Sequence, residues 1–513
     1  MESTKVRLRF DVLGVSREKI WTAGHRAVWS SSRLSVVFGV AIAVVLGARG
    51  QAVWLPLDAV GRVDVGLPLD GRQIFVSDSR GDDTNDGLSS ATAVKTLSKA
   101  MSLVRSGKPD QVLLKRGDRF LDQSFGQIND VTTGGPSPDR PFVIASYGTG
   151  ARPIVTPAKF GEGTPDGLRV WSDNFSNVLI KSVSIERPTD EFGGGAGISI
   201  LNPISNVHIE DVRVSGFATN VVLQGRRETH MTDVVIRRSI FDNAFVDRAE
   251  LDAHSSGLYA SNVERLTIEE SVFDHNGWNA EIEEARPTKF NHNVYIQSDS
   301  LDVVFRDNIV GRASAAGLQM RPGGEVINNL FIANNDAFYL SDGQSDAAGL
   351  AVDNVVLHGS DKDIAGAVSW GIDMKDNAGY RALHNIVAHG PDGAGAALVG
   401  LDGVLAEGNV VYDWGTSEDV GPIAELVDPD RTIFSYMEAL GLEPTIEAFM
   451  LASAMFEEGT LDPRFTAQAV NSYFREGFAA NEQWGRNDAK YVPTPTAIAA
   501  VPLLMWCLLR RPT

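Results

Sequence analysis

Short runs of residues that alternate apolar and polar side chains recur along the middle of the chain. Three of them read GLYA, NVYIQ and GLQMR, at residues 257–260, 293–297 and 317–321. Alternation at a period of two residues is typical of strands with one buried face. Each run is followed by one or two further short apolar strands before the next run begins. This pattern predicts a parallel β-helix, a solenoid in which each coil buries its inward side chains against neighbouring coils only.

Stacking of the coils predicts columns of outward side chains. The first predicted column consists of Tyr259, Tyr295, Gln319 and Tyr339. The second consists of Ser261, Gln297, Arg321 and Ser341. His254 and His292 come shortly before the first two runs. A rigid face that gathers His, Tyr, Gln and Arg predicts a site that binds or cuts a long polymer.

A second register supports the same fold. Nine polar residues each precede a short apolar strand: Ser182, Asp211, Ser239, Ser271, Asn308, Asn329, Asn354, Asn385 and Asn409. Stacked at one turn, such side chains bond backbone groups and one another between coils, so we predict an internal polar ladder with a structural role. The spacing of these positions ranges from 21 to 37 residues. The longer intervals predict inserted loops, which commonly build a binding face.

The pattern also divides the chain into segments. Residues 97–104 place Leu97, Ala100, Met101 and Val104 on one helical face, and a strand follows at 111–115. We predict an N-terminal cap and first coils over 74–166, coils over 167–420 and a C-terminal helical cap over 421–489. Helices at 445–456 and 463–478 would cover the final coil and block edge-to-edge pairing.

One turn near the start of the fold, DDTNDG at 82–87, could hold Ca²⁺ through its hard oxygen ligands. Asp and Asn also simply form good turns. No other cofactor is expected, because the histidines lack a regular zinc-ligand spacing.

The first 52 residues predict a signal or anchor segment. An apolar run at 35–48 is shorter than a membrane-spanning helix, follows a stretch rich in Arg and Lys, and precedes small residues. A cleaved signal, an uncleaved anchor and a buried core element all remain open.

The last segment, 490–513, contains a Pro-rich motif, an apolar stretch from Ala497 to Leu509 and two arginines. It resembles the PEP-CTERM sorting signal, which implies processing by an exosortase. Thr494 stands where that signal usually has glutamate, and Pro502 interrupts the apolar stretch. The alternative is a plain membrane tail. We predict a protein exported to the periplasm, outer surface or medium, in contact with the membrane through its terminal segments.

Composition restricts the partners. The net charge is −20, which argues against nucleic acid as a ligand, since that requires a basic stripe. An acidic polysaccharide would therefore need a local cationic patch. Cys507 is the single cysteine, so no intrachain disulfide and no cysteine-based metal site can form. We expect a monomer that acts on polysaccharide.

The predicted face offers the groups that β-elimination requires. A uronate carboxylate must be neutralised, the C5 proton abstracted and the leaving O4 protonated. Arg321 or Gln319 could pair with the carboxylate. His292 could be the base, because the pKa of a histidine lies near working pH, and Tyr295 could be the acid. The residues predicted to bind neighbouring sugars are His254, Tyr259, His275, Trp278, Gln297 and Tyr339.

Other interpretations remain open. An inverting hydrolase needs two carboxylates roughly 6.5–9.5 Å apart, for which the candidates are Asp336, Asp342, Asp346 and Asp373. A non-catalytic protein that binds exopolysaccharide would use the same face. The tyrosine column could be packing alone, and Arg321 precedes a Pro-Gly-Gly turn that it could merely flank.

The opening IFVSDSRGDDTNDGLSSATAVKTL and the central text FDHNGWN…NHNVYIQ…RDNIVGRASAAGLQMRPGGEVINNLF resemble bacterial right-handed parallel β-helix proteins of the pectate-lyase-like superfamily, over about residues 74–420. The resemblance implies the handedness of the fold. It implies lyase, epimerase or hydrolase activity only as a class. The Asp-Pro-His-Asp motif of mannuronan epimerases is absent from the sequence, and the calcium-binding aspartates of pectate lyases are not evident. A lyase that cleaves a uronate-containing polysaccharide is the first expectation.

Overall fold

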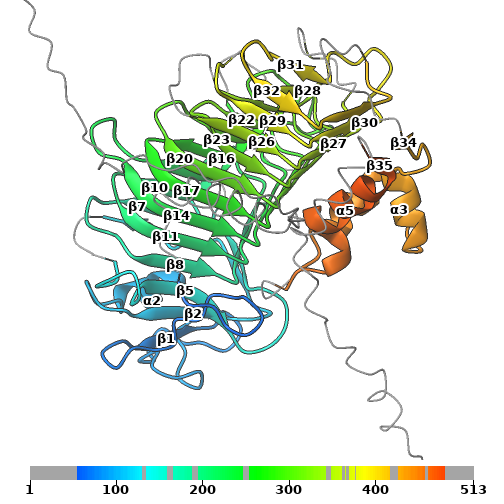
Figure 1. Cartoon of the computed structure of the whole chain (residues 1–513). Helices are drawn as coiled ribbons and strands as arrows, with labels where there is room; N and C mark the ends of the chain where they lie inside the picture. The colour runs from blue at the N-terminus through cyan, green and yellow to red at the C-terminus, as the bar shows by residue number, and fades with distance from the viewer. Residues whose placement is uncertain are drawn as a thin grey trace, which may run out of the picture. The chain divides into compact units, whose positions relative to one another are not determined.

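Repeated coils of three short strands make up the central part of the computed structural model (Figure 1). It describes residues 55–129, 134–158, 166–187, 194–246, 254–341, 348–360, 364, 369–375, 377–415, 426–456 and 460–479. The chain divides into two units, 1–49 and 50–513, and the described residues belong to the second. The predicted terminal segments, 1–52 and 490–513, lie outside the described residues. Within the described ranges no helix is long and apolar enough to cross a membrane.

Three parallel sheets, called I, II and III below, run along the stack of coils, and successive strands of the chain enter them in turn. Among the described residues, sheet I consists of β4 (Gln127–Ile128), β7 (Leu168–Trp171), β10 (Ala196–Leu201), β13 (Thr219–Gln224), β16 (Ser256–Ser261), β19 (His292–Ile296), β22 (Ala316–Met320), β25 (Asp336–Leu340), β28 (Trp370–Asp373) and β31 (Leu398–Val399). Sheet II consists of β1 (Gln73–Val76), β2 (Gln111–Lys115), β5 (Phe142–Tyr147), β8 (Val178–Lys181), β11 (Ser205–Glu210), β14 (Met231–Arg237), β17 (Val263–Glu269), β20 (Leu301–Arg306), β23 (Gly324–Ile327), β26 (Gly349–Val352), β29 (Arg381–Leu383) and β32 (Leu405–Glu407). Sheet III consists of β3 (Arg119–Leu121), β6 (Ile154–Thr156), β9 (Ser184–Glu186), β12 (Arg213–Ser215), β15 (Ile240–Asp242), β18 (Val272–Asp274), β21 (Ile309–Gly311), β24 (Leu330–Ile332), β27 (Val355–Leu357), β30 (Ile386–Ala388) and β33 (Val410–Tyr412).

The architecture is a right-handed parallel β-helix, as predicted. Each strand pairs in parallel with the equivalent strand one coil away, for example β16 with β19 and β19 with β22. One apolar core fills the interior of the coils. The rings of Phe241 and Phe273 stack on successive rungs of sheet III, and Phe305 of sheet II packs against Phe273. Because every coil contacts only its neighbours, the core grows by repetition.

The predicted polar ladder is present inside the turns that join sheet II to sheet III. Its longest part consists of Asn308, Asn329, Asn354, Asn385 and Asn409. In each step the side-chain oxygen of one asparagine accepts from the backbone N–H and the side-chain amide of the asparagine one coil earlier, at 2.9–3.1 Å. Ser239 and Ser271 continue the ladder toward the N-terminus. These side chains are at most 4% exposed, so the ladder is structural.

The N-terminal part matches its predicted elements, a helix α2 (Leu97–Ser102) followed by strand β2. The carboxylates of the 82–87 turn hold the turn itself. Asp82 accepts from the backbone N–H of Thr84, and Asp83 accepts from the backbone N–H groups of Lys95 and Thr96. Calcium at this turn stays a prediction.

The C-terminal helices lie against the side of the β-helix, on the outer face of sheet III (Figure 1). They are α3 (Ile433–Ala439), α4 (Ile446–Ser453), the 3₁₀ turn η2 (Pro463–Phe465) and α5 (Ala467–Gly477), and a small antiparallel pair, β34 (Leu426–Val427) and β35 (Phe478–Ala479), adjoins them. The helices pack on sheet III because its outward side chains are themselves apolar, among them Ile309, Leu330 and Val355. The prediction that the helices cover the final coil is therefore wrong in position. A Cβ atom at Gly311 would lie 2.8 Å from Cε and Sδ of Met450, so α4 places the end of the Met450 side chain directly on this glycine.

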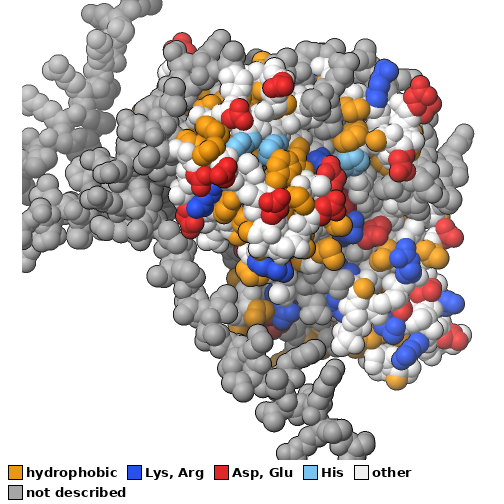
Figure 2. All heavy atoms as spheres, turned by 90° about the vertical axis from the view of Figure 1, so that its right-hand side faces the viewer, with side chains coloured by type: hydrophobic (Ala, Val, Ile, Leu, Met, Phe, Trp, Pro, Cys, Tyr) orange, Lys and Arg blue, Asp and Glu red, His pale blue; other side chains and the backbone are white. Residues whose placement is uncertain are grey.

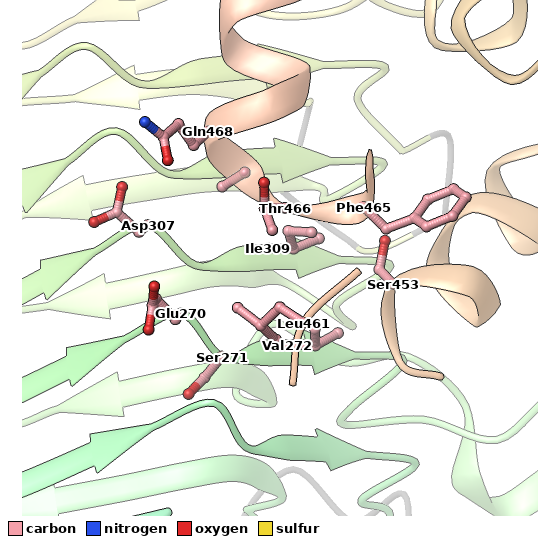
Figure 3. Close-up of a pocket in the computed structure, with 11 residues that line it drawn as sticks. Glu270, Ser271, Val272, Asp307, Ile309, Ser453, Leu461, Phe465, Thr466 and Gln468 are labelled. Atoms are coloured by element: carbon pink, nitrogen blue, oxygen red, sulfur yellow. The ribbon is translucent and has the colours of Figure 1, made fainter. Parts of the chain in front are cut away.

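A cavity of about 90 Å³ lies where these helices meet the corner of sheet III (Figure 3). Glu270 and Asp307, from successive turns of the β-helix, line one side of it. Both carboxylates already have partners, since Arg238 Nε lies 2.6 Å from Glu270 Oε2 and Asn328 Nδ2 lies 2.6 Å from Asp307 Oδ1. This cavity is a packing feature of the helical cap.

Charge of both signs is spread over the face that Figure 2 shows. Acidic, basic and hydrophobic side chains alternate there, with histidines among the hydrophobic ones. The net negative charge of the chain is therefore not gathered into one patch on this face.

His358, under helix α3, is expected to make the helical cap sensitive to acid. Its ring lies 5.0 Å from Phe434 and 5.8 Å from His389, and burial, together with His389, lowers its pKa to about 4. An unfolded histidine titrates near 6.5, so the unfolded chain gains the proton first. The resulting stability is fully present above pH 6.5 and is lost as the pH falls toward 4, by at most about 3 kcal/mol. His358→Phe should flatten the pH dependence of the unfolding free energy over this range; parallel curves for the two proteins would contradict the assignment.

Candidate active site

The outer face of sheet I carries most of the polar residues singled out in the sequence. Its strands begin with a bend, after which two consecutive side chains point inward. In β19, Asn293 bonds Asn276 and Gly311 O inside the coil, and Val294 joins the apolar core. His292 and Tyr295 therefore both point outward, three residues apart, with ring centroids 5.3 Å apart. Asp336 and Tyr339 occupy the same two positions on β25.

The strand register confirms the two predicted columns. Tyr259 pairs with Tyr295, Tyr295 with Gln319, and Gln319 with Tyr339. The same column continues to Asp373 on β28. Gln297, Arg321 and Ser341 follow directly after these rungs, with their backbone N–H groups bonded to the preceding coil.

Gln319 is the centre of the cluster. A guanidinium only donates hydrogen bonds, so the amide oxygen of Gln319 faces Arg321, at 2.8 Å from Nε and 3.2 Å from Nη2. The amide nitrogen then faces His292 Nε2 at 2.8 Å and Tyr339 Oη at 2.7 Å. Nε2 of His292 therefore carries the lone pair. The backbone N–H of Ala316 also points at His292 Nδ1, at 3.3 Å. A neutral imidazole accepts at only one nitrogen, and the shorter contact, 2.8 Å from the Gln319 amide, assigns that role to Nε2.

The pKa of His292 is far from the range that the sequence suggested. Its side chain is 5% exposed, and this burial, with His254 and Arg321 nearby, lowers its pKa to about 3. The expectation of a pKa near working pH is therefore wrong, because desolvation disfavours the imidazolium. His292 stays neutral at physiological pH and is a weak base. Its position suits a hydrogen-bond partner that holds Gln319.

The two tyrosines of the cluster stay protonated. Burial raises the pKa of Tyr339 well above its usual range and raises that of Tyr295 as well. The Arg321 guanidinium lies 5.4 Å from the Tyr295 ring centroid. Both phenols can donate a hydrogen bond to a ligand, and neither is a base at neutral pH.

The remaining predicted residues divide into two groups. His254 lies beside Phe290, two residues before the start of β16, and Tyr259 packs edge to face on Tyr295 at 5.6 Å. The structure does not bring His275 and Trp278 to this cluster. The His275 and Trp278 rings pack on each other at 4.2 Å, and the indole N–H donates to Arg312 O beside the end of sheet III.

A cleft of about 300 Å³ opens at the C-terminal end of the cluster. It is lined by Arg321, Asp336, Phe338, Tyr339, Ser341, Trp370, Asp373 and Lys375. Trp370 and Lys375 were not found from the sequence. Extending the column of Arg321 and Ser341 by one rung leads to Lys375, two residues after Asp373, whereas Trp370 pairs with Asp336 and lies outside both columns. Asp342 and Asp346 lie outside the described residues.

The two carboxyl groups of this cleft have different environments. Burial raises the pKa of Asp336 to about 6, and its Oδ1 has no hydrogen-bond partner in the described part of the chain. Asp373 pairs with Lys375, whose Nζ lies 2.5 Å from Oδ2 and 4.9 Å from the Tyr339 ring centroid. One carboxyl thus keeps its proton to a higher pH than an ordinary aspartate does, and the other is held by a cation.

A family model for this fold matches the central part of the chain. Residues 158–357 match the family model described as the right-handed beta helix region. Among similar solved structures, the pectate lyase Pel9A is 13% identical with a TM-score of 0.47, and the match covers 72% of this chain and 86% of that chain. A GH136 lacto-N-biosidase from Eubacterium ramulus is 14% identical with a TM-score of 0.40, covering 66% and 68%. An alginate lyase from Paenibacillus sp. str. FPU-7 is 12% identical with a TM-score of 0.35, covering 68% and 99%.

No curated protein sequence matches the chain. Sequence identities this low assign no reaction to the chain, and the residues of the cleft itself indicate its chemistry.

Proposed function

We propose that the chain hydrolyses glycosidic bonds of an acidic polysaccharide in the cleft on sheet I. The observation that carries this proposal is Asp336, a carboxyl group with a pKa of about 6 and an unbonded oxygen, which shares a cleft with the lysine-paired Asp373. A carboxyl group whose pKa is raised by burial, in one cleft with a second carboxylate held by a lysine, offers an acid and a base for hydrolysis.

The spacing of the pair supports inversion. Asp336 pairs with Trp370, and Asp373 lies three residues further along that strand. At about 3.3 Å per residue and about 4.8 Å between strands, the two backbone positions are about 11 Å apart. Side chains that converge over one cleft from that distance match the ~6.5–9.5 Å of inverting enzymes better than the ~5 Å of retaining ones.

The chemical step follows from these roles. Asp336 gives its proton to the glycosidic oxygen as the bond from that oxygen to C1 breaks. Asp373 takes a proton from a water molecule, whose oxygen forms the new bond to C1 on the opposite face. Arg321 and Lys375 supply the local cationic patch that an acidic sugar needs on a chain of charge −20.

Elimination is the second candidate, and one observation favours it. Arg321 and Lys375 both line the cleft, where they could neutralise the uronate carboxylate and so acidify the C5 proton. His292 is a poor base for that proton because its pKa is about 3.

Export through the N-terminal segment and surface retention through the C-terminal one belong to the same proposal of an enzyme that meets polysaccharide outside the cell.

Product analysis separates the candidates. The full-length protein is incubated with polygalacturonate, alginate and a neutral xylan. We expect new reducing ends from an acidic polymer, without the ultraviolet absorbance of unsaturated sugars, and NMR should show the inverted anomer first. Unsaturated products would establish elimination instead. Retention of a polymer without any cleavage would contradict both and indicate a binding protein.

A further inference from the structure

An exposed indole stands on sheet I far from the cleft. Trp171, the last residue of β7, is 49% exposed. The guanidinium of Arg169 lies 5.0 Å from its ring centroid, and Asp166 lies 3.8 Å from that guanidinium. The side chain of Arg169 is itself 36% exposed. One face of the Trp171 indole is thus packed against the Arg169 guanidinium, which is itself exposed enough to contact a ligand.

Trp171 belongs to the same outward column as Arg321. It pairs with Leu201, which pairs with Gln224, which in turn pairs with Ser261. Gln297 and Arg321 follow in the next two coils. From β7 to β22 there are five strand steps, which at about 4.8 Å each amount to about 24 Å.

The surface between these two points is suited to a sugar chain. Gln224 is exposed, and the Tyr259 and Tyr295 rings lie beside the column with Gln297. From Trp171 a saccharide that follows the column would pass Leu201 and then meet the amides of Gln224 and Gln297, with the two phenols beside them. Ser261, between the two amides, is 5% exposed and bonded to Asp299. The path of the saccharide would lead from the cleft to the indole without leaving sheet I.

We propose that Trp171 and Arg169 form a distal subsite that binds the same acidic polysaccharide whose cleavage site is the cleft. The indole would stack on the C–H face of a sugar ring, and Arg169 would hold a carboxylate or hydroxyl of that sugar. The inference rests on the proposed function, since it takes the chain in the cleft as its starting point. It makes the protein selective for long chains, because a short oligomer bound in the cleft does not reach Trp171.

Kinetics with substrates of two lengths test the subsite. On the polygalacturonate or alginate that the protein cleaves, Trp171→Ala should raise KM about three- to tenfold and leave kcat unchanged, because one stacked aromatic contact is lost. On the trisaccharide of the same sugar the two proteins should not differ. Trp171→Phe should restore part of the loss. The matched control is Leu301→Ala, which removes another exposed hydrophobic side chain, 44% exposed on sheet II, and should leave both substrates unaffected.

Failure of the subsite is distinguishable from failure of the proposed function. If Asp336→Asn stops cleavage but Trp171→Ala behaves like Leu301→Ala, the subsite is wrong and the reaction stands. If no polymer is cleaved, affinity electrophoresis in gels containing the same two polymers replaces the kinetics. Weaker retardation of Trp171→Ala there supports the subsite alone. Equal retardation of the two variants, or no retardation of the wild-type protein, overturns it.

Discussion

Replacing Asp336 by asparagine is expected to abolish cleavage and, at neutral pH, to make the protein more stable. Asparagine has nearly the same shape but cannot give a proton to the leaving oxygen. Loss of a general acid lowers kcat about 10²- to 10⁴-fold. The pH profile of the wild-type protein should fall on its alkaline side with a pKa near 6, because Asp336 must be protonated to act.

The stability effect has the opposite sign from that of an ordinary paired carboxylate. Burial raises the pKa of Asp336 from 3.8 to about 6, so the folded protein holds this proton more tightly than the unfolded chain. The group's contribution to stability is fully present below pH 3.8 and is lost as the pH rises through 6. Asparagine does not ionise and so avoids that loss. Above pH 6 the free energy of unfolding of the variant should exceed that of the wild-type protein by at most about 3 kcal/mol, and partial exposure of the side chain reduces this difference.

The measurement is a pair of curves, cleavage rate and thermal midpoint against pH. Asp307→Asn is the matched control, because Asp307 is also a carboxyl with a pKa raised by burial but lies under the C-terminal helices. It should keep full activity. An Asp336→Asn variant that retains most of its kcat would remove Asp336 from the reaction.

The second large effect is expected inside the coils, from Asn354→Ala. The Asn354 side chain accepts from the backbone N–H and the amide of Asn329, and donates to Val326 O and Asn385 Oδ1, all at 2.9–3.0 Å. It is 0% exposed. Alanine leaves several of these partners buried and unsatisfied, at about 1–3 kcal/mol each, so the free energy of opening these coils should fall by about 3–5 kcal/mol.

Hydrogen exchange measures this loss of stability at the coils where it occurs. A global unfolding transition does not isolate it, because groups of neighbouring coils in a solenoid open separately from the rest. The backbone N–H groups of Asn329 and Asn354 should lose protection first. Asn409→Ala should have a smaller effect than Asn354→Ala, because Asn409 bonds only one neighbouring ladder residue, Asn385. Asn174→Ala, at an exposed position, should change stability by less than about 0.5 kcal/mol. Equal effects of the Asn354 and Asn174 variants would show that the ladder contributes little.

Much of the fold follows from the sequence because two independent periodicities have to agree in a β-helix. The alternation in runs such as residues 293–297 sets which side chains leave the core, and the asparagines set where each coil turns. With both in place the register of Tyr295, Gln319 and Tyr339 is determined. The cluster of His292, Gln319 and Arg321 was therefore predictable as a grouping.

The chemistry of the site was less predictable, for two physical reasons. At the start of β25 two consecutive side chains, Ala337 and Phe338, lie in the core and break the two-residue period. Asp336 and its partner Trp370 therefore line the cleft, where simple alternation from Phe338 and Ile372 would turn them inward. The pKa values depend on burial, which is set by the whole assembled face. Burial lowers the pKa of His292 and raises that of Asp336, so the base expected from residue type became a weak one and a carboxyl of the rival interpretation became the candidate acid.

The C-terminal helices have a consequence for the order in which the molecule assembles. Coils can stack one by one as the chain emerges, since each needs only the coil before it. The guanidinium of Arg152, next to β6, bonds both Asp211 and the backbone oxygen of Phe456, 304 residues later in the chain. A segment that follows all the described coils in the sequence thus holds one of the early coils. A growing chain would therefore hold its early coils without this contact until residue 456 had been synthesised.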